Sequence, residues 1–369
     1  MYQFCVPCLM GVEGLLADEL RFGGFQDVQA ENGRVLFYGT EQDCARANIV
    51  LRCGERVLLR LADFTAKSFD DLFEGVKAIP WEEYVGSVDA FPVKGYSIHS
   101  QLHSVPDCQR IIKKAAVERL RRIYHTDWLK ETGARHQIQF SLLNDRCEIY
   151  LDTTGAPLYK RGYKLVQNEA TLRETLAASI VKVSRWRGGE PLIDPFCGSG
   201  TIAIEAAQVA LHIAPGVNRD FDASKWNGRF EAAFMLGKQQ AIFNRRWGKL
   251  PILVSDRDPN CVRLTRENAA RAGVGDSIEY AVQDARKIDW RAREGVMMAN
   301  PPYGVRMMER EEAKQLYRDL GAAMRGSRVK KYIISSDERF EEDFGQRADK
   351  RRKLYNGMMK CNLYMYYKG

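Results

Sequence analysis

The sequence predicts an α/β protein whose C-terminal part is a doubly wound parallel sheet with an antiparallel edge strand, preceded by α+β units. Three observations support this fold class. From about residue 168, apolar strand-like runs alternate with helical segments, a pattern typical of parallel sheets covered by helices on both faces. A glycine-rich loop joins an early strand of this series to its helix. Ahead of residue 155, short strands and helices are mixed without that regular alternation.

The N-terminal part is predicted to contain two small units and a linker. Apolar periodicity in the first unit predicts strands at 2–6 and 33–38, with helices at 12–21 and 42–52. In the second unit, the residue pattern predicts helices at 69–76 and 107–124, and strands at 90–99, 135–143 and 146–152. A turn at Asn144-Asp145 joins the last two strands, and Gly155-Ala156-Pro157 marks a boundary. We therefore expect domains at 1–60 and 61–155, a linker at 156–168 and a C-terminal domain at 169–369.

The C-terminal domain is predicted to alternate strands and helices as follows. The strands are 191–194, 252–256, 278–281, 295–299 and 329–335, and the helices are 172–185, 201–211, 259–272 and 311–324. The segment 353–367 resembles one more strand, broken at Asn356-Gly357-Met358. We place it antiparallel at the edge of the sheet.

Composition excludes several classes of protein. At 369 residues the chain is too long for one ordinary core, and 45% hydrophobic with 28% charged residues is typical of a globular protein. The longest apolar stretch, 192–214, is interrupted by Asp194, Glu205 and His212, so we expect no membrane span, no secretory signal and a cytoplasmic location. The net charge of +8 is compatible with a polyanionic partner.

The nine cysteines include one C-x-x-C pair, Cys5 and Cys8. That spacing occurs in redox dithiols and in half zinc sites. A zinc site needs a second pair of ligands, and the five histidines and other cysteines offer no such spacing. We therefore expect reduced, buried thiols and no metal.

The glycine-rich loop is the strongest candidate for a ligand site. It follows an apolar strand that ends in a carboxylate, and an apolar helix starts directly after it. Ligands of open α/β sheets bind beyond the carboxyl ends of the strands, glycines allow close approach, and helix N-termini attract negative charge. We expect a nucleotide-like ligand at Asp194, Pro195, Phe196, Cys197, Gly198, Ser199, Gly200 and Thr201.

This loop also fits the dinucleotide fingerprint, with Gly198, Gly200 and Ala203 at the required spacing. A dinucleotide site needs an acidic residue about 20 positions further on, at the tip of the next strand. That interval holds a polar insertion at 218–225, and the next credible strand ends only at Asp256. A dehydrogenase therefore remains the distant alternative.

A second motif, Asn300-Pro301-Pro302-Tyr303, follows the strand 295–299. Two prolines cannot continue a strand ladder, so the chain must leave the sheet there. The Asn300 amide oxygen and the Pro301 carbonyl are fixed acceptors that can hold both hydrogens of a base amino group, which directs its lone pair at an electrophilic methyl. Tyr303 can stack on a base extracted from its helix. The motif predicts chemistry on an exocyclic base nitrogen.

The order DPFCGSGT, SDRD, QDA and NPPYG resembles class I methyltransferases that act on amino groups of bases. The chain is more narrowly similar to THUMP-domain RNA methyltransferases related to the N-terminal half of the large-subunit ribosomal RNA guanine-N2 methyltransferase. The segments SQLHSVPD at 100–107 and LYKRGY at 158–163 are similar to that family's THUMP region and linker. The resemblance implies a Rossmann-like methyltransferase sheet behind a ferredoxin-like/THUMP region.

The resemblance also implies roles for individual residues. S-adenosyl-L-methionine would be the cofactor, with its amino-acid end at 194–201, its ribose hydroxyls on Asp256 and its adenine amino group on Asp284. Asp258 would instead cap the following helix, since it precedes Pro259. Asn300 to Tyr303 would form the catalytic motif, and no metal is required.

Several basic residues are candidates for RNA contact: Lys113 and Lys114 on one helix, Lys160, Arg161 and Lys164 in the linker, the run 350–353, and Arg306 beside the catalytic motif. The insertion 214–226, with Arg219, Phe221 and Trp226, is expected to cover the target base. The leading hypothesis is guanine-N2 methylation of ribosomal RNA. Transfer RNA, adenine N6 of a nucleic acid and a non-catalytic RNA-binding role remain alternatives, and the oligomeric state stays open.

Overall fold

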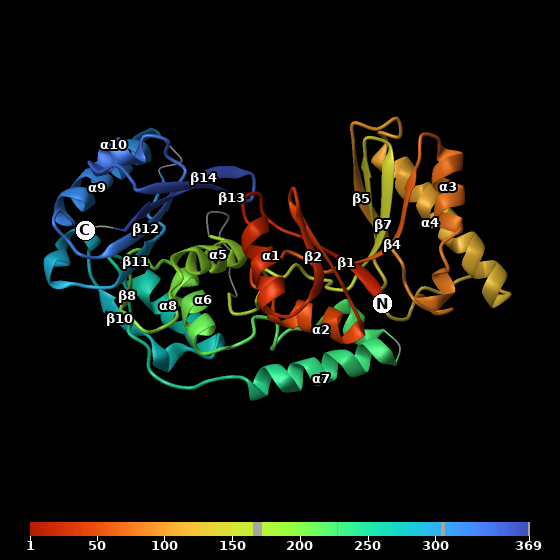
Figure 1. The fold of residues 1–369 in the computed structure, drawn as a ribbon, viewed down its shortest axis with the longest axis horizontal. Coiled ribbons are helices and arrows are strands. Elements are labelled where there is room, and N and C mark those ends of the chain that lie inside the picture. The colour runs from red at the N-terminus through yellow and green to blue at the C-terminus, as the bar shows by residue number, and fades with distance from the viewer. Residues whose placement is uncertain (165–171, 227, 304–306, 368–369) are drawn as a thin grey trace.

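The computed structural model describes residues 1–164, 172–226, 228–303 and 307–367, with only the backbone considered at 307–310. Figure 1 shows an elongated molecule in which the C-terminal sheet lies at one end and the second N-terminal unit at the other. The first N-terminal unit, with α1 and α2, lies between them.

One seven-stranded sheet contains the strands of both N-terminal units, in the order β2-β3-β1-β4-β7-β6-β5. The strands are β1 (Tyr2–Pro7), β2 (Gln26–Glu31), β3 (Arg34–Gly39), β4 (Leu58–Thr65), β5 (Val93–Ile98), β6 (Ile138–Leu143) and β7 (Arg146–Asp152). The helices are α1 (Glu13–Phe22), α2 (Glu41–Val50), α3 (Phe69–Lys77) and α4 (Val105–Tyr124). Because β4 pairs with both β1 and β7, the two units are joined through a continuous ladder.

The second sheet has the order β10-β9-β8-β11-β12-β14-β13. Its strands are β8 (Leu192–Asp194), β9 (Ile252–Asp256), β10 (Glu279–Val282), β11 (Val296–Ala299), β12 (Lys330–Ser335), β13 (Lys350–Asn356) and β14 (Met359–Tyr366). Its helices are α5 (Glu174–Ser184), α6 (Thr201–Ala210), α7 (Arg229–Phe243), α8 (Pro259–Arg271), α9 (Met307–Ala323) and α10 (Phe340–Phe344). Strands β8 to β12 are parallel, and β14 pairs antiparallel with β12. The predicted fold class is confirmed.

Several elements differ from the sequence prediction, and the short helix α10 is one that was not predicted. Strand β2 was not predicted because most of its residues are exposed and it lacks apolar alternation. Strand β4 was missed because its register shifts between Arg60 and Ala62, which interrupts the period of two. Helix α7 was missed as well. The predicted broken edge strand is a hairpin, in which Gly357 adopts a φ of 66° and β13 folds back on β14.

The linker crosses the interior between the N-terminal sheet and α6. Arg161 is buried there; its Nε lies 3.3 Å from Glu205 Oε1, and its other nitrogens donate to the carbonyls of Leu158 and Arg52. Lys164 is similarly engaged, 3.3 Å from Glu174. The expectation that Arg161 and Lys164 contact RNA is therefore wrong, because both cations neutralise buried carboxylates inside the protein.

The insertion 214–226 also has a different place from the one predicted. Trp226 is buried, stacks on His136 of the second N-terminal unit at 4.5 Å, and donates its indole N–H to the Arg135 carbonyl. Arg219 donates to the carbonyls of Pro157 and Leu158, both at 2.9 Å. Since these side chains are buried against the linker and the N-terminal sheet, the insertion fastens the parts of the molecule together and does not cover a target base.

Replacing Arg161 by alanine leaves Glu205 buried without its cation. We expect the free energy of unfolding to fall by about 3–5 kcal/mol, the usual cost of removing one partner of a buried pair. Urea unfolding followed by tryptophan fluorescence measures this change. Lys160→Ala, at the exposed neighbouring position, is the matched control, and equal stability of the two variants would contradict this assignment.

Candidate active site

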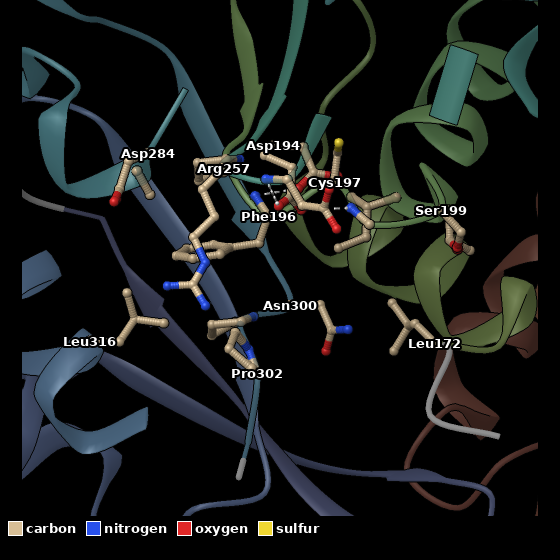
Figure 2. A pocket seen from close by; sticks show the side chains of 18 of the residues that line it. Leu172, Asp194, Phe196, Cys197, Ser199, Arg257, Asp284, Asn300, Pro302 and Leu316 are labelled. Atoms are coloured by element: carbon tan, nitrogen blue, oxygen red, sulfur yellow. Dashed lines mark hydrogen bonds between the residues drawn. The ribbon is translucent and has the colours of Figure 1, made fainter. Parts of the chain in front are cut away.

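The carboxyl ends of β8, β9 and β11 meet at one edge of the C-terminal sheet, where they surround a pocket of about 510 Å³. The pocket is within the size range of small-molecule and cofactor sites. In Figure 2, Asp284 and Leu316 lie on one side of the pocket, Ser199 and Leu172 on the other, and Arg257 and Asn300 between them. Of the residues predicted for catalysis and cofactor binding, the following line it: Asp194, Pro195, Phe196, Cys197, Gly198, Ser199, Thr201, Asp256, Asp284, Asn300, Pro301, Pro302 and Tyr303.

The glycine-rich loop is fixed by contacts from α8. Gly200 has a φ of 81°, and a Cβ at this position would lie 2.7 Å from the Thr265 side chain, so only glycine fits. Thr265 Oγ1 donates to the Gly198 carbonyl at 3.0 Å, and Asn268 Nδ2 donates to the Ser199 carbonyl at 2.9 Å. Helix α6 then starts at Thr201, which leaves its N-terminus facing the loop.

Asp194 is fully buried at the end of β8. Its Oδ1 accepts one hydrogen bond from the Phe196 backbone N–H at 3.3 Å. The pKa of Asp194 is raised to about 7, mainly by burial; the Phe196 N–H opposes this shift and the nearby charge of Asp256 adds to it. A buried carboxylate of this kind gains most from a cationic ligand group, because such a group compensates its lost hydration.

Asp256 ends β9 and orders the backbone around it. One carboxylate oxygen accepts from the Gly198 N–H at 3.1 Å and the other from the Asp258 N–H at 3.1 Å. Asp258 caps α8 by accepting from the Asn260 N–H at 2.9 Å, with Pro259 at the first helical position. Both carboxylates line the pocket, and Asp258 in addition caps α8 as predicted.

Asp284 lines the opposite side of the pocket. It accepts from the backbone N–H of Arg286 at 2.9 Å and from that residue's guanidinium at 2.6 Å, which lowers the pKa of the carboxyl to about 2. A carboxylate has about four lone-pair sites, so Asp284 retains acceptor capacity for a ligand N–H.

The Asn300 side chain lies beyond the end of β11. Tyr303 turns back on it and donates its hydroxyl to Asn300 Oδ1, while Tyr317 donates to the Pro302 carbonyl at 2.8 Å. The Tyr303 ring is therefore partly buried beside Asn300. Because an amide oxygen has two lone pairs, one remains for a substrate N–H.

The predicted RNA contacts that the structure describes are not among the pocket residues. Lys160 and Lys114 are exposed, whereas Lys113 is 2.7 Å from Glu131 and lies over the Phe91 ring. Arg306 lies outside the described residues. In the run 350–353, Arg352 donates to the Gly11 carbonyl at 2.8 Å, which joins β13 to the N-terminal domain.

Several residues that line the pocket were not assigned from the sequence, among them Leu172, Arg257, Arg286 and Leu316. Arg257 stands between two predicted carboxylates and extends into the pocket toward Pro302 (Figure 2). Its place directly after a strand end was a usable signal, but the other three have no local motif.

The described residues also bear on the predictions for metals, thiols and membrane spans. No group of three or more His, Cys, Asp or Glu side chains among them could hold a metal ion, and the nine cysteines are free thiols. Burial raises the pKa of Cys5 to about 12 and that of Cys8 as well. Among the same residues, no helix has the length and apolar character needed to cross a membrane.

The fold and the pocket define an S-adenosylmethionine-dependent methyltransferase. The pocket lies at the carboxyl ends of the parallel strands, beside a glycine loop and a helix N-terminus, where nucleotide-like ligands of such sheets bind. Three family profiles match the chain: "RMKL-like, methyltransferase domain" at 161–365, "RlmL ferredoxin-like domain" at 3–58 and "THUMP domain" at 66–152. The chain belongs to the RMKL-like methyltransferase family.

The chain is 41% identical over 373 residues to the putative RNA methyltransferase YpsC of Bacillus subtilis, covering 99% of this chain and 96% of that protein. It is 35% identical over 380 residues to the ribosomal RNA large subunit methyltransferase K/L of Psychromonas ingrahamii, covering 99% of this chain and 50% of that protein. The chain thus spans about half the length of the K/L relative.

Two solved structures superpose on the whole length of this chain. A possible methylase from Clostridium difficile 630 superposes with a TM-score of 0.95 and 41% identity, covering 100% of this chain and 98% of that one. SMU.472, a putative methyltransferase complexed with SAH, superposes with a TM-score of 0.94 and 37% identity, covering 100% and 98%. S-adenosylhomocysteine is the demethylated form of the cofactor, so this neighbour supports the same cofactor assignment.

The raised pKa of Asp194 predicts a pH-dependent stability. An unfolded aspartate loses its proton near 3.8 and the folded one near 7, so ionisation of the buried group costs stability as pH rises between these values. Asp194→Asn removes that cost and should be more stable than the wild type at pH 8, by up to about 4 kcal/mol, with little difference at pH 4. Thermal unfolding of both proteins without cofactor measures the difference, and a constant gap at every pH would refute it.

Proposed function

We propose that the protein transfers a methyl group from S-adenosylmethionine to the exocyclic N2 of a guanine in structured RNA, namely large-subunit ribosomal RNA. One observation carries the proposal: Asn300 and the two prolines lie at the end of β11, on the rim of the pocket that suits the cofactor. In this position, the Asn300 amide oxygen and the Pro301 carbonyl would hold a base amino group next to the methyl group of the bound cofactor.

The motif's own acceptors would hold the target nitrogen. The Asn300 amide oxygen and the Pro301 carbonyl each accept one N–H of the amino group, which turns its lone pair toward the pocket. The Tyr303 hydroxyl, which donates to Asn300, would share the amide oxygen with the incoming amine, since that oxygen has two lone pairs.

The pocket residues would hold and orient the cofactor. When bound, S-adenosylmethionine supplies an already activated methyl group, so alignment of nitrogen, methyl and sulfur is the main task of the protein. The positions 194–201 surround the amino-acid end, Asp256 accepts from the ribose hydroxyls and Asp284 from the adenine amino group. The methylated nitrogen becomes acidic and loses its proton to water.

The N-terminal domains would supply the RNA grip. The THUMP profile covers much of the predicted second domain, and the relatives of the K/L class are named as ribosomal RNA methyltransferases. We propose the division into 1–60, 61–155, a linker at 156–168 and a catalytic domain at 169–369. Lys113, Lys114, Lys160 and Arg306 are the proposed phosphate contacts, of which Lys114 and Lys160 are exposed in the structure.

Asn300→Ala should lower the rate of methyl transfer at least about 100-fold, the usual effect of removing a group that acts on the reacting atoms. RNA from a strain that lacks the gene is incubated with labelled S-adenosylmethionine, and its nucleosides are then separated. Label in N2-methylguanosine that is lost in Asn300→Ala supports the proposal. Label in N6-methyladenosine, or label confined to transfer RNA, overturns the substrate, and binding of cofactor without any transfer favours a non-catalytic role.

Substitutions of Tyr303 separate stacking from hydrogen bonding. Tyr303→Phe keeps the ring and releases Asn300 Oδ1, so we expect the rate to stay within about 10-fold of the wild type. Tyr303→Ala loses the stacking surface, so its rate of methyl transfer should fall by about 100-fold or more. Equal losses in both variants would instead make the hydroxyl the essential group, and cofactor affinity serves as the control for folding.

A further inference from the structure

Helix α7 and the loop after it carry a run of exposed apolar side chains, here called the cluster, none of which lines the pocket. Its members are Met235, Leu236, Ile242, Phe243 and Trp247. Phe243 is 89% exposed and Trp247 is 77% exposed, although large aromatic side chains are normally covered. Figure 1 shows α7 along the lower edge of the molecule, with the chain running from its end toward the C-terminal sheet. A cluster of this kind marks an interaction surface.

The charge of the same segment indicates the partner. Between Glu231 and Asp256 the chain has no acidic residue, whereas it has four cations: Lys238, Arg245, Arg246 and Lys249. Lys238 lies 3.7 Å from Asp220. Arg246 and Lys249 are exposed, and neither has a carboxylate within 4.0 Å in the described parts of the chain. The surface is therefore both aromatic and cationic.

Trp247 is held in place although it is exposed. The Arg245 guanidinium lies 3.6 Å from the centre of its ring and also donates to the Gly273 carbonyl. The neighbouring backbone is fixed on both sides, because the Arg246 N–H donates to the Leu211 carbonyl at 2.7 Å and Ser277 Oγ donates to the Gly248 carbonyl at 2.8 Å. A flat ring held in this way is preorganised for stacking, since little freedom is lost on binding.

We propose that this surface, formed by Phe243, Trp247, Arg246 and Lys249, is a second RNA-binding site that stacks on unpaired bases. Aromatic rings interleaved with cations are the means by which proteins hold single-stranded nucleic acid. A second copy of the chain is a poorer occupant: a twofold interface would place the same cations opposite one another. The inference rests on the proposed RNA substrate and adds a contact to it.

The site lies at the opposite end of β9 from the methyl-transfer pocket. The loop enters β9 at Ile252, and Asp256 ends it at the pocket, a rise of about 13 Å along the strand. We expect contacts at this distance to strengthen binding of the ground and transition states equally, and such uniform binding acts on KM and leaves kcat unchanged.

Trp247 provides a direct optical test. Of the six tryptophans, Trp81, Trp186, Trp226 and Trp290 are buried, and Trp128 is the other exposed one at 79%. In a Trp128→Phe background, a short single-stranded oligouridylate should quench the exposed tryptophan fluorescence, and a fully paired duplex of the same length should quench it less. Adding Trp247→Ala should abolish the response.

Affinity for the same oligouridylate, measured by fluorescence anisotropy, should fall about 5- to 100-fold in Phe243→Ala and in Trp247→Ala. Trp247→Phe should retain most of it, and Arg246→Gln with Lys249→Gln should flatten the salt dependence. Phe22→Ala is the matched control, because that aromatic is 91% exposed on the N-terminal domain, outside the cluster.

Unchanged RNA affinity in the Phe243 and Trp247 variants overturns the proposal. If these variants then lose a dimer on sedimentation, the surface is instead an interface between two copies of the chain. Failure of the methyl-transfer assay with quenching preserved would instead refute the proposed function alone. With active enzyme, the variants should raise KM for RNA and leave kcat within about 2-fold.

Discussion

The parallel pairing of β8 with β9 and of β8 with β11 is the constraint on which the site depends. Parallel strands end at one edge, so the pairing brings Asp194, Asp256 and Asn300 around one pocket although up to 106 positions separate them in the sequence. Contacts from α8 then fix the glycine loop between two of these strand ends. Without this parallel register, the three side chains would not line the same pocket.

The second requirement is that the catalytic domain be fixed to the N-terminal sheet. The buried ion pair joins Arg161, in the segment before α5, to Glu205 of α6, and Trp226 of the insertion stacks on His136 of the second N-terminal unit. Moving the two parts of the molecule apart would separate the buried charges. Each charge would then lose its partner without regaining its hydration, which is energetically costly. The RNA grip proposed for the N-terminal domains would therefore stand in a fixed relation to the pocket.

The sequence was most informative where local chemistry dictates local structure. The strand ends at Asp194 and Asp256, the cap at Asp258 and the two-proline stop after β11 were all predictable from residues a few positions apart. Long-range facts were not. The burial of Arg161 depends on a carboxylate 44 positions away, and the pairing of β4 with β1 joins two units that pattern alone separates. A basic residue near tyrosines has the same local pattern whether it lies on a surface or in a core.

Calorimetric titration of the full chain with S-adenosylmethionine tests the central claim most directly. The account predicts one site per chain, and Asp256→Asn should bind at least about 10-fold more weakly because it loses charge-assisted acceptance from the ribose hydroxyls. Asp258→Asn, which keeps a side chain able to cap α8, should bind like the wild type. No binding by the wild-type chain, or equal weakening in both variants, would contradict the assignment of the pocket.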